Sequence, residues 1–351
     1  HMVTKTSFRL LQTLINLGPS PEPNITIFWD PELPAGYKEF CAHISIETSS
    51  IQYESDRQIR DEWGDDAAIA CCVSPMEVGK QMQFFGARVN AAKALLYAMN
   101  GGRDEVSGKQ IVEGYEPIQG DGPLDFDEVW QKYEEMLDWV VGTYVEALNI
   151  IHYSHDKYAY EAVEMALHDS NIIRSMGCGI AGLSIVADSL SAIKYAKVTP
   201  VRDETGLITD YITEGEFPFY GNDDDRADDI AATIVHTVME KIKAIPMYRN
   251  AIPTQSVLTI TSNVVYGKAT GSFPSGHKAG TPFSPGANPE NGADNHGMVA
   301  SMLSVGKLDY KDALDGISLT NTITPSGLGR TPEERITNLV GVLDAGFIME
   351  Q

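Results

Sequence analysis

The sequence predicts an α/β protein, and two observations support this fold class. Runs with the apolar spacing of helices alternate with short runs rich in β-branched and apolar residues, and the 351 residues contain no internal repeat and no clear linker. We therefore expect one α/β domain over residues 3–351, in which the strands form either a barrel or a layered sheet. His1 and Met2 are set aside as the remnant of an expression tag.

Two strands and one helix are predicted near the start of the chain. Residues 24–29 are rich in β-branched and aromatic residues and lie between prolines, which favours a strand. Residues 67–73 form an uninterrupted apolar run that ends at a Ser-Pro pair, which favours a strand buried on both faces. Residues 77–100 change to helical spacing and end at two glycines, which predicts a helix.

The remainder of the chain is predicted to be mainly helical. Apolar spacing predicts helices over residues 126–153, 158–167, 180–196, 227–245 and 332–343. Residues 201–219 are expected to form an exposed hairpin, and residues 256–266, rich in β-branched residues, a strand. Residues 267–297 are rich in Gly, Pro and Asn, which predicts a long loop that is functional or mobile.

The composition excludes several classes of partner. The chain has 49 acidic and 26 basic residues, a net charge of −23, so its surface repels nucleic acids and anionic membranes. No run reaches the roughly 18 apolar residues of a membrane span. The four cysteines have neither zinc-ribbon spacing nor the number needed for a disulfide scaffold. We therefore expect no nucleic-acid or membrane partner and a reducing, cytoplasmic setting.

The adjacent Cys71 and Cys72 are the candidate catalytic residues. Buried cysteines are more often small apolar side chains than reactive groups. Neighbours in a strand point to opposite faces, however, so one thiol would face a substrate cavity and the other a different partner. A nucleophilic thiolate needs a histidine or a helix N-terminus nearby, and no histidine is close in sequence. A dry apolar setting instead favours chemistry by a neutral thiyl radical.

Arg88 is the candidate for binding a substrate anion. It follows two phenylalanines and a Gly-Ala pair on the predicted helix, so it is either a surface arginine or a partly buried one. A buried guanidinium needs an anion, and a small carboxylate would supply one through two parallel hydrogen bonds. His152 and His155 have no third ligand in step, and residues 271–278 carry His277 where a phosphate-binding loop needs lysine. We therefore expect no metal site and no nucleotide site.

Residues 69–100, IACCVSPMEVGKQMQFFGARVNAAKALLYAMN, resemble the cysteine-loop segment of the pyruvate formate-lyases, a branch of the glycyl radical enzymes. The adjacent cysteine pair is distinctive of this branch. The likeness extends over nearly the whole chain through segments such as SFRLLQTLINLGPSPEPNITI and GIAGLSIVADSLSAIKYAKVTPVRDE. The resemblance implies a barrel core of two five-stranded halves surrounded by helices, here incomplete.

The resemblance also implies roles for five residues. Cys71 would attack the carbonyl of pyruvate and become acetylated, and Cys72 would give its hydrogen to the glycyl radical and relay the radical onward. Arg88 would bind the pyruvate carboxylate. Phe85 would form a wall of the substrate pocket, and Leu258 would lie on a strand that lines it.

The implied activity is that of a formate C-acetyltransferase, an acyltransferase of pyruvate metabolism in anaerobic fermentation. Such an enzyme converts pyruvate and coenzyme A (CoA) to acetyl-CoA and formate by glycyl and thiyl radical chemistry. The resemblance implies a cytoplasmic homodimer that is activated by a radical S-adenosylmethionine enzyme. CoA is a co-substrate, and we expect this chain itself to bind no cofactor.

The chain departs from the family pattern in two ways. It has no Arg-Val-Ser-Gly-Tyr motif, which carries the radical glycine in the family, and Ser275-Gly276-His277 stands where Asp-Gly-Arg is usual. These departures predict an internal core fragment, inactive by itself, without the N-terminal part and the C-terminal glycyl radical domain. The alternatives are an inactive core or interaction scaffold and a formate-lyase specific for 2-oxobutyrate, which has one more methylene than pyruvate.

Overall fold

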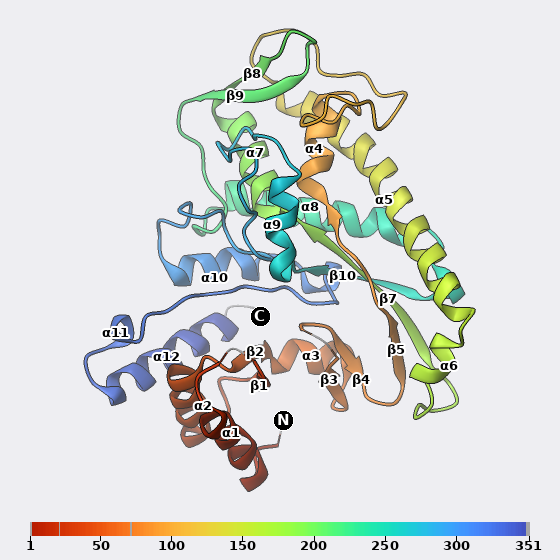
Figure 1. Ribbon diagram of the computed structural model, residues 1–351. Helices are drawn as coiled ribbons and strands as arrows, with labels where there is room; N and C mark the ends of the chain where they lie inside the picture. Colours follow the sequence, from red (N-terminus) through yellow and green to blue (C-terminus); the bar gives the residue numbers. More distant parts are fainter. Residues whose placement is uncertain (1, 21, 71, 349–351) are drawn as a thin grey trace. The chain divides into compact units, whose positions relative to one another are not determined.

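The computed structural model describes residues 2–20, 22–70 and 72–348. The chain divides into two compact units, one formed by residues 1–78 and 321–351 and the other by residues 79–320. Each unit has its own hydrophobic core. Figure 1 labels the elements of both units.

The elements of the first unit are α1 (Lys5–Leu17), β1 (Ile25–Trp29), α2 (Ala35–Thr48), β2 (Ile51–Ser55), α3 (Asp56–Trp63), β3 (Ala67–Ile69), β4 (Pro75–Glu77), α11 (Pro325–Leu328) and α12 (Pro332–Ile348). Strands β1 and β2 pair in parallel, and β3 and β4 form an antiparallel hairpin. Helix α12 packs against α2, and Asp344 on α12 accepts hydrogen bonds from Trp29 Nε1 at 3.1 Å and Lys38 Nζ at 2.7 Å. These bonds fix the end of the chain to its beginning.

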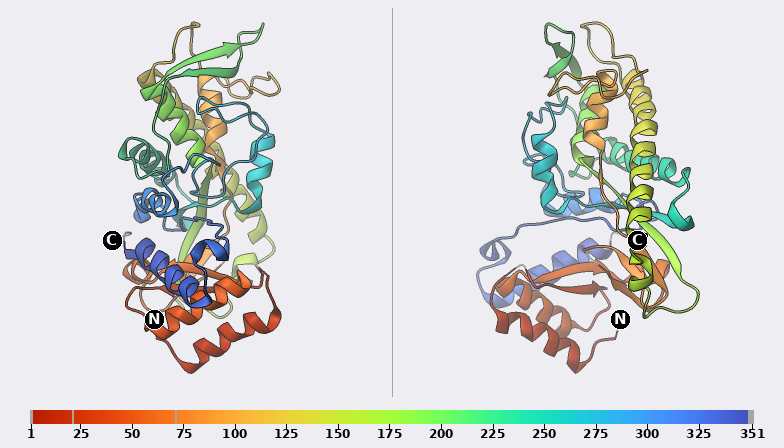
Figure 2. Two further views of the ribbon diagram at one scale, coloured as in Figure 1. Left: turned by 90° about the vertical axis from the view of Figure 1, so that its left-hand side faces the viewer. Right: turned by 45° about the vertical axis from the view of Figure 1, so that its right-hand side comes forward.

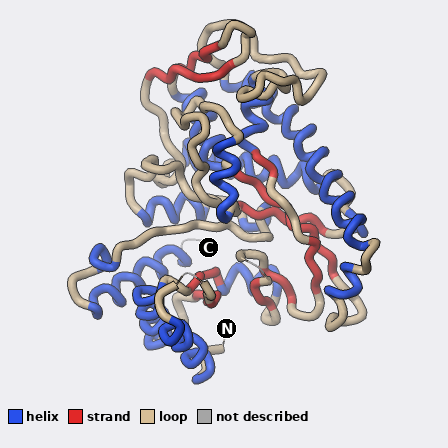
Figure 3. The backbone as a smooth tube through the Cα atoms, viewed as in Figure 1, coloured by secondary structure: helices blue, strands red, loops and turns tan. Residues whose placement is uncertain are grey.

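The elements of the second unit are β5 (Gln81–Phe84), β6 (Val89–Asn90), α4 (Ala91–Met99), α5 (Phe126–Asp156), α6 (Tyr160–Glu164), β7 (Ile173–Ala181), α7 (Leu183–Tyr195), β8 (Lys197–Arg202), β9 (Ile208–Glu214), α8 (Asp225–Lys243), η1 (Tyr248–Asn250), β10 (Ile252–Val257), η2 (Ile260–Ser262), α9 (Asn263–Lys268), α10 (Met298–Gly306) and η3 (Tyr310–Asp312). Strand β7 is the centre of a parallel sheet in the order β10-β7-β5, and β6 also pairs with β7. Figure 3 shows these strands in red, with α5 running alongside them.

The sequence of β7 explains its central position. Its last seven residues are buried, as expected for a parallel strand with helices on its faces. Helices α4, α5, α7 and α8 supply much of the surrounding apolar core. Beyond α7 the chain forms the β8–β9 hairpin, which projects from the end of this unit in Figure 2.

An ion-pair network attaches the start of the long loop to α4. Lys93 Nζ lies 2.7 Å from Asp104 Oδ2, 2.8 Å from Glu105 Oε1 and 2.7 Å from the carbonyl oxygen of Ala269. Glu105 Oε1 also accepts a hydrogen bond from the backbone N–H of Gly271 at 2.8 Å. The side chain of Glu105 is only 2 % exposed. The network therefore compensates a buried carboxylate while it holds the loop in place.

Several predicted elements are confirmed. The strand predicted over 24–29 is β1, and the helices predicted over 126–153, 227–245 and 332–343 are α5, α8 and α12. The hairpin predicted over 201–219 is β8–β9, shifted toward the N-terminus, whereas only the middle of the helix predicted over 158–167 forms, as α6. Residues 269–297 contain neither helix nor strand, as predicted for the long loop. Within the described residues, no helix has both the length and the apolar character needed to cross a membrane.

Two predictions near the cysteine pair are wrong. The strand predicted over residues 67–73 ends at Ile69, and Ala68 is exposed rather than buried, because the chain turns back to form the β3–β4 hairpin. The helix predicted over residues 77–100 begins only at α4, and its first part forms β4, β5 and β6. The chain around Gly86 follows β7 instead of coiling into a helix, and it approaches so closely that a Cβ atom at Gly86 would lie 1.1 Å from the carbonyl oxygen of Gly177. At this point the backbone of the segment between β5 and β6 meets the backbone of β7.

The boundaries of two further elements differ from the prediction. The helix predicted over residues 180–196 is the end of β7 followed by α7, and Gly182, with φ +86°, separates them. The strand predicted over residues 256–266 is the end of β10 followed by η2 and α9. Its β-branched residues favour a strand locally, but only residues up to Val257 pair with β7. Pairing with a distant strand decides where β10 ends.

Candidate active site

Cys71, the first of the candidate catalytic residues, lies outside the described residues. Cys72 is half-buried and lies in the connection between β3 and β4, and its carbonyl oxygen accepts a hydrogen bond from Gln52 Nε2. The backbone N–H of Ala70 donates to the carbonyl oxygen of Ser74 at 2.8 Å and closes this connection. The prediction that Cys72 lies in a strand is therefore wrong. The argument from opposite strand faces does not apply to it.

Arg88, Phe85 and Leu258 belong to the second unit. Arg88 lies in an irregular segment between β5 and β6, not on a helix as predicted, because the chain there follows the edge of β7. Its side chain passes over Gly179 of β7. A Cβ atom at Gly179 would lie 2.9 Å from Arg88 Cγ and 2.7 Å from Ser256 Oγ, which is too close for either atom. The glycine therefore makes room for both side chains.

The guanidinium of Arg88 has an unsatisfied hydrogen-bond donor. Its Nε is buried and has no hydrogen-bond partner among the described residues. A buried N–H of a cation is costly to leave unpaired, and a carboxylate satisfies it best because it offers two acceptors to the planar guanidinium. Arg88 is therefore suited to bind an anion.

Two tyrosines hold the backbone around Arg88. The hydroxyl of Tyr144 on α5 accepts a hydrogen bond from the N–H of Gly179 at 3.1 Å and donates one to the carbonyl oxygen of Ala87. The hydroxyl of Tyr266 on α9 donates to the carbonyl oxygen of Arg88 at 3.4 Å. Tyr144 thus links the central strand to the irregular segment, and the position of Arg88 does not depend on that segment alone.

The groups next to this segment stay uncharged near neutral pH. Burial raises the pKa of the Cys178 thiol to about 12, and burial also raises the pKa of Tyr144 well above its usual value. The hydroxyl of Ser256 donates to the carbonyl oxygen of Cys178 at 3.1 Å. Neither the thiol nor the phenol therefore supplies a negative charge to Arg88, which makes no ion pair within the part of the chain that the structure describes.

Phe85 and Leu258 have different surroundings. The side chain of Phe85 is 63 % exposed, and its carbonyl oxygen accepts a hydrogen bond from His152 Nε2 at 2.7 Å. Leu258 is buried and follows the last residue of β10, so it lies just beyond the strand on which it was expected. The roles of both residues as walls of a substrate pocket stay predictions.

Two histidines of the sequence analysis, His152 and His277, bond to other parts of the protein. His152 is buried, which lowers the pKa of its ring, and it bonds to the carbonyl oxygen of Phe85. In the long loop, His277 Nδ1 lies 2.9 Å from Glu290 Oε2 and Nε2 lies 3.2 Å from the carbonyl oxygen of Thr281. These contacts fix His277 within the segment 275–277, which differs from the family pattern.

Sequence reasoning missed Gly179, Ser256 and Tyr144, which position Arg88. One signal for them was present, since residues 176–180 read Met-Gly-Cys-Gly-Ile within an apolar run. A glycine inside a strand often marks a close approach by another part of the chain. The pattern does not show which side chain makes that approach.

Two family models match the chain. The model described as pyruvate formate lyase-like matches residues 1–267, and the model described as glycine radical matches residues 283–351. The prediction that the C-terminal glycyl radical domain is absent from this chain is therefore wrong, because the second match covers the end of the chain. The Arg-Val-Ser-Gly-Tyr motif nevertheless does not occur in the sequence.

Similar proteins support the same family. The chain is 59 % identical over 347 residues to formate acetyltransferase 1 of Escherichia coli (strain K12), a match that covers 99 % of this chain and 46 % of that protein. The chain thus spans about half the length of this curated relative.

Solved structures confirm the predicted fold class. A glycyl radical enzyme from Archaeoglobus fulgidus aligns with TM-score 0.82 and 20 % identity, over 99 % of this chain and 48 % of that chain. A glycerol-bound B12-independent glycerol dehydratase from Clostridium butyricum aligns with TM-score 0.83 and 23 % identity, over 100 % of this chain and 48 % of that chain. At these identities the likeness shows the fold alone. The family model that matches residues 1–267 shows that this chain belongs to the pyruvate formate lyase-like family.

Proposed function

We propose that this chain is the core of a formate C-acetyltransferase, which converts pyruvate and CoA to acetyl-CoA and formate. The observation that carries the proposal is the 59 % identity to a formate acetyltransferase over 99 % of the chain. The environment of Arg88 supports it independently, because the buried and unpaired Nε is suited to a small carboxylate such as that of pyruvate.

The cysteines have unequal proposed roles. A glycyl radical would supply one-electron chemistry. The Cys72 thiol would give its hydrogen atom to that radical and take one from the Cys71 thiol, and the sulfur radical of Cys71 would then add to the carbonyl carbon of pyruvate. Cleavage of the C–C bond would leave an acetyl group on the sulfur of Cys71 and the carbon dioxide radical anion, which would take the hydrogen atom of the Cys72 thiol to give formate. The thiol of CoA then accepts the acetyl group. The covalent intermediate divides one difficult cleavage into easier steps.

The remaining residues and partners complete the proposal. Leu258 and Phe85 would line the pocket for the methyl group of pyruvate, and CoA would be the second substrate. A radical S-adenosylmethionine enzyme would generate the radical, and the enzyme would act as a cytoplasmic homodimer. The family suggests that residues 3–351 work as one catalytic core.

Substitution of the cysteines in the enzyme that contains this chain tests the proposal. After anaerobic activation we expect Cys71→Ser and Cys72→Ser each to abolish formate production, because each thiol carries a different step. Cys41→Ala is the matched control, since Cys41 is fully buried in α2 of the first unit. Formate production by either serine variant at the level of the control would contradict the proposed roles.

Arg88→Lys tests binding of the carboxylate separately. Lysine keeps the charge but loses the two parallel hydrogen bonds, so we expect kcat/KM for pyruvate to fall by roughly a hundredfold, or about 3 kcal/mol. Arg103→Lys serves as the control, because the guanidinium of Arg103 bonds to Thr205 in the hairpin turn, away from the segment that carries Arg88. Formate and the organic radical signal are measured together, so that loss of the radical is distinguished from loss of substrate binding. An unchanged kcat/KM in Arg88→Lys, with the radical present, would refute this role.

A further inference from the structure

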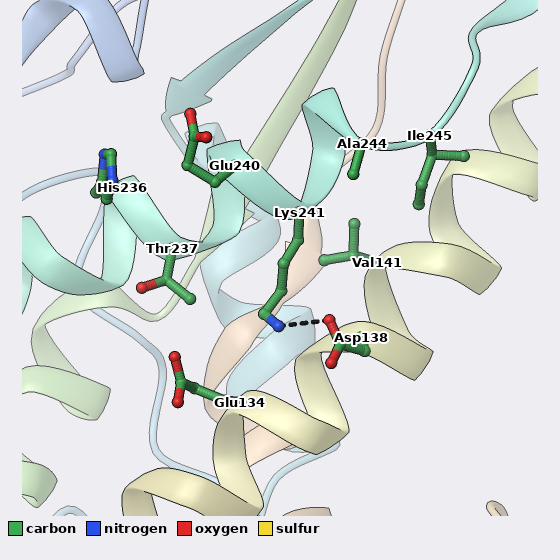
Figure 4. Close-up of a pocket in the computed structure, with 9 residues that line it drawn as sticks. All are labelled: Glu134, Asp138, Val141, His236, Thr237, Glu240, Lys241, Ala244 and Ile245. Atoms are coloured by element: carbon green, nitrogen blue, oxygen red, sulfur yellow. Dashed lines mark hydrogen bonds and ion pairs between the residues drawn. The ribbon is translucent and has the colours of Figure 1, made fainter.

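One face of α8 carries two potential metal ligands. His236 and Glu240 are one helical turn apart and project from the same side of the helix, as Figure 4 shows. Both side chains are exposed. Asp312, the last residue of η3, completes the group, and its Oδ2 lies 2.8 Å from His236 Nδ1.

The three side chains have the donors and the spacing that a divalent metal ion requires. One nitrogen and two carboxylate oxygens, one from each residue, all lie within 4.8 Å of one another. Zinc takes imidazole and carboxylate ligands at about 2.0–2.2 Å, so its ligand atoms lie about 3–3.5 Å apart in a tetrahedral site. Small rotations of the exposed His236 and Glu240 side chains would bring the ligand atoms from within 4.8 Å to these shorter separations. Three protein ligands also leave a position for water.

A buried glutamine fixes the two elements that carry these ligands. Gln255 lies on β10 and is fully buried. Its Nε2 donates one hydrogen bond to the carbonyl oxygen of Val235, next to His236, at 3.0 Å and another to the carbonyl oxygen of Asp312 at 2.9 Å. A single amide thus holds α8 and η3 at a constant separation. Such support reduces the entropy that binding an ion would otherwise cost.

The two carboxylates already attract a cation. Lys243 Nζ lies 3.0 Å from Glu240 Oε1 and 3.8 Å from Asp312 Oδ1. Its side chain is 43 % exposed, so the ammonium can move into solvent when a divalent ion arrives. His236 and Glu240 also line a pocket of about 550 Å³ between α5 and α8 (Figure 4).

We propose that His236, Glu240 and Asp312 form a binding site for a divalent transition-metal ion of the zinc class. The site lies on the second unit and uses none of the residues assigned to the reaction with pyruvate. A test of metal binding needs neither the radical nor pyruvate. A negative result would therefore refute the metal site without bearing on the proposed function.

Calorimetric titration of the chain with Zn²⁺ tests the proposal. The protein carries Cys71→Ser and Cys72→Ser, because adjacent thiols bind zinc themselves. We expect one ion per chain, and we expect His236→Ala and Glu240→Gln each to weaken binding by at least about tenfold, since each removes a ligand. His155→Ala is the matched control, because His155 is an exposed histidine on the long helix α5 and lies outside the group. This control should bind as tightly as the parent.

A gain of affinity provides a second and more specific result. Lys243→Gln removes the competing ammonium, so we expect it to tighten zinc binding several-fold. A mere loss of folding cannot produce this effect, and circular dichroism verifies that each variant is folded. The proposal is overturned if the parent shows no saturable binding below about 1 mM, if His236→Ala binds as tightly as His155→Ala, or if Lys243→Gln does not raise the affinity.

Discussion

Gly179 lies on the central strand β7, directly beneath the side chain of Arg88. The hydrogen atom of this glycine occupies a place where Ser256 Oγ and Arg88 Cγ leave no room for a methyl group. Tyr144 accepts a hydrogen bond from the N–H of Gly179 and donates one to the carbonyl oxygen of Ala87. Gly179 therefore helps to position both the side chain of Arg88 and the backbone just before it. The position of the Arg88 side chain therefore depends on residue 179 being a glycine.

Gly179→Ala should destabilise the protein. The added Cβ would meet Ser256 Oγ at 2.7 Å and Arg88 Cγ at 2.9 Å, so we expect the free energy of unfolding to fall by about 1–3 kcal/mol. Gly142→Ala is the control, because Gly142 lies within α5 with open space around a Cβ, and alanine should stabilise that helix by about 0.5–1 kcal/mol. Urea unfolding measures both. Equal free energies of unfolding for the two variants would show that Arg88 and Ser256 move aside without destabilising the protein.

Much of what is local about the candidate site could be predicted from the sequence. The residues before Arg88 left open whether its guanidinium is at the surface or partly buried, and the structure places its Nε in a buried position. Ser256 and Tyr144 could not be assigned to it, because they are distant in sequence and come near only when β10 pairs with β7 and α5 packs beside the sheet. The resemblance to a family supplied the roles of Cys71 and Cys72, whereas the apolar pattern supplied the wrong local structure for Cys72.

At the scale of elements, sequence periodicity predicted the long helices α5, α8 and α12 correctly. It predicted a helix where the short strands β5 and β6 form. Residues 77–90 satisfy the spacing of a helix, but they form short strands and an irregular segment along β7, where Gly86 closely approaches the backbone of Gly177. The segment 256–266 was predicted as a strand from its β-branched residues, yet no partner strand continues beyond Val257. Short strands depend on partners elsewhere in the chain, and their own residues do not reveal those partners.

The network around Lys93 is expected to stabilise the attachment of the long loop to α4. Lys93→Met leaves the carboxylate of Glu105 buried without a cation, and such a change typically costs about 3–5 kcal/mol. The double variant Lys93→Met/Glu105→Gln should recover part of this loss, because the uncompensated charge is removed as well. The free energy of unfolding is measured for each variant in a double-mutant cycle.

Lys109→Met is the matched control for this network, since Lys109 is exposed. We expect it to change the free energy of unfolding by less than about 0.5 kcal/mol. A loss in Lys109→Met as large as that in Lys93→Met would count against the network. Strict additivity of the two substitutions in the double variant would count against it equally.

At the scale of the whole molecule, the excess of acidic residues decides how the protein responds to salt. With 49 acidic and 26 basic residues, many carboxylates have no cation to pair with. Exposed pairs such as Lys197 with Glu214 contribute little each, so repulsion between the remaining carboxylates outweighs them. The family match assigned the fold and the proposed reaction, but this property follows from composition alone.

Salt should therefore stabilise the folded chain. Raising NaCl from about 0.02 to about 0.2 M shortens the Debye length to below about 10 Å and screens the repulsion. We expect the midpoint of thermal unfolding, measured by calorimetry, to rise by a few degrees. The same concentrations of a neutral osmolyte serve as the control and should have a smaller effect. A lower midpoint in NaCl would show that attractive ion pairs dominate instead.

The parallel sheet has a consequence for how the chain folds. Strands β5 and β6 reach β7 only through the long segment that carries α4 and α5, and β7 reaches β10 through the segment that carries α7 and α8, so no two strands paired in this sheet are joined by a hairpin turn. Each pairing must therefore close a large loop before it gains any contacts, whereas the β8–β9 hairpin and α5 can form locally. Until both neighbours arrive, the edges of β7 present unpaired backbone groups to other chains. The strand beneath Arg88 is thus also the segment at which misassociation during refolding is most to be expected.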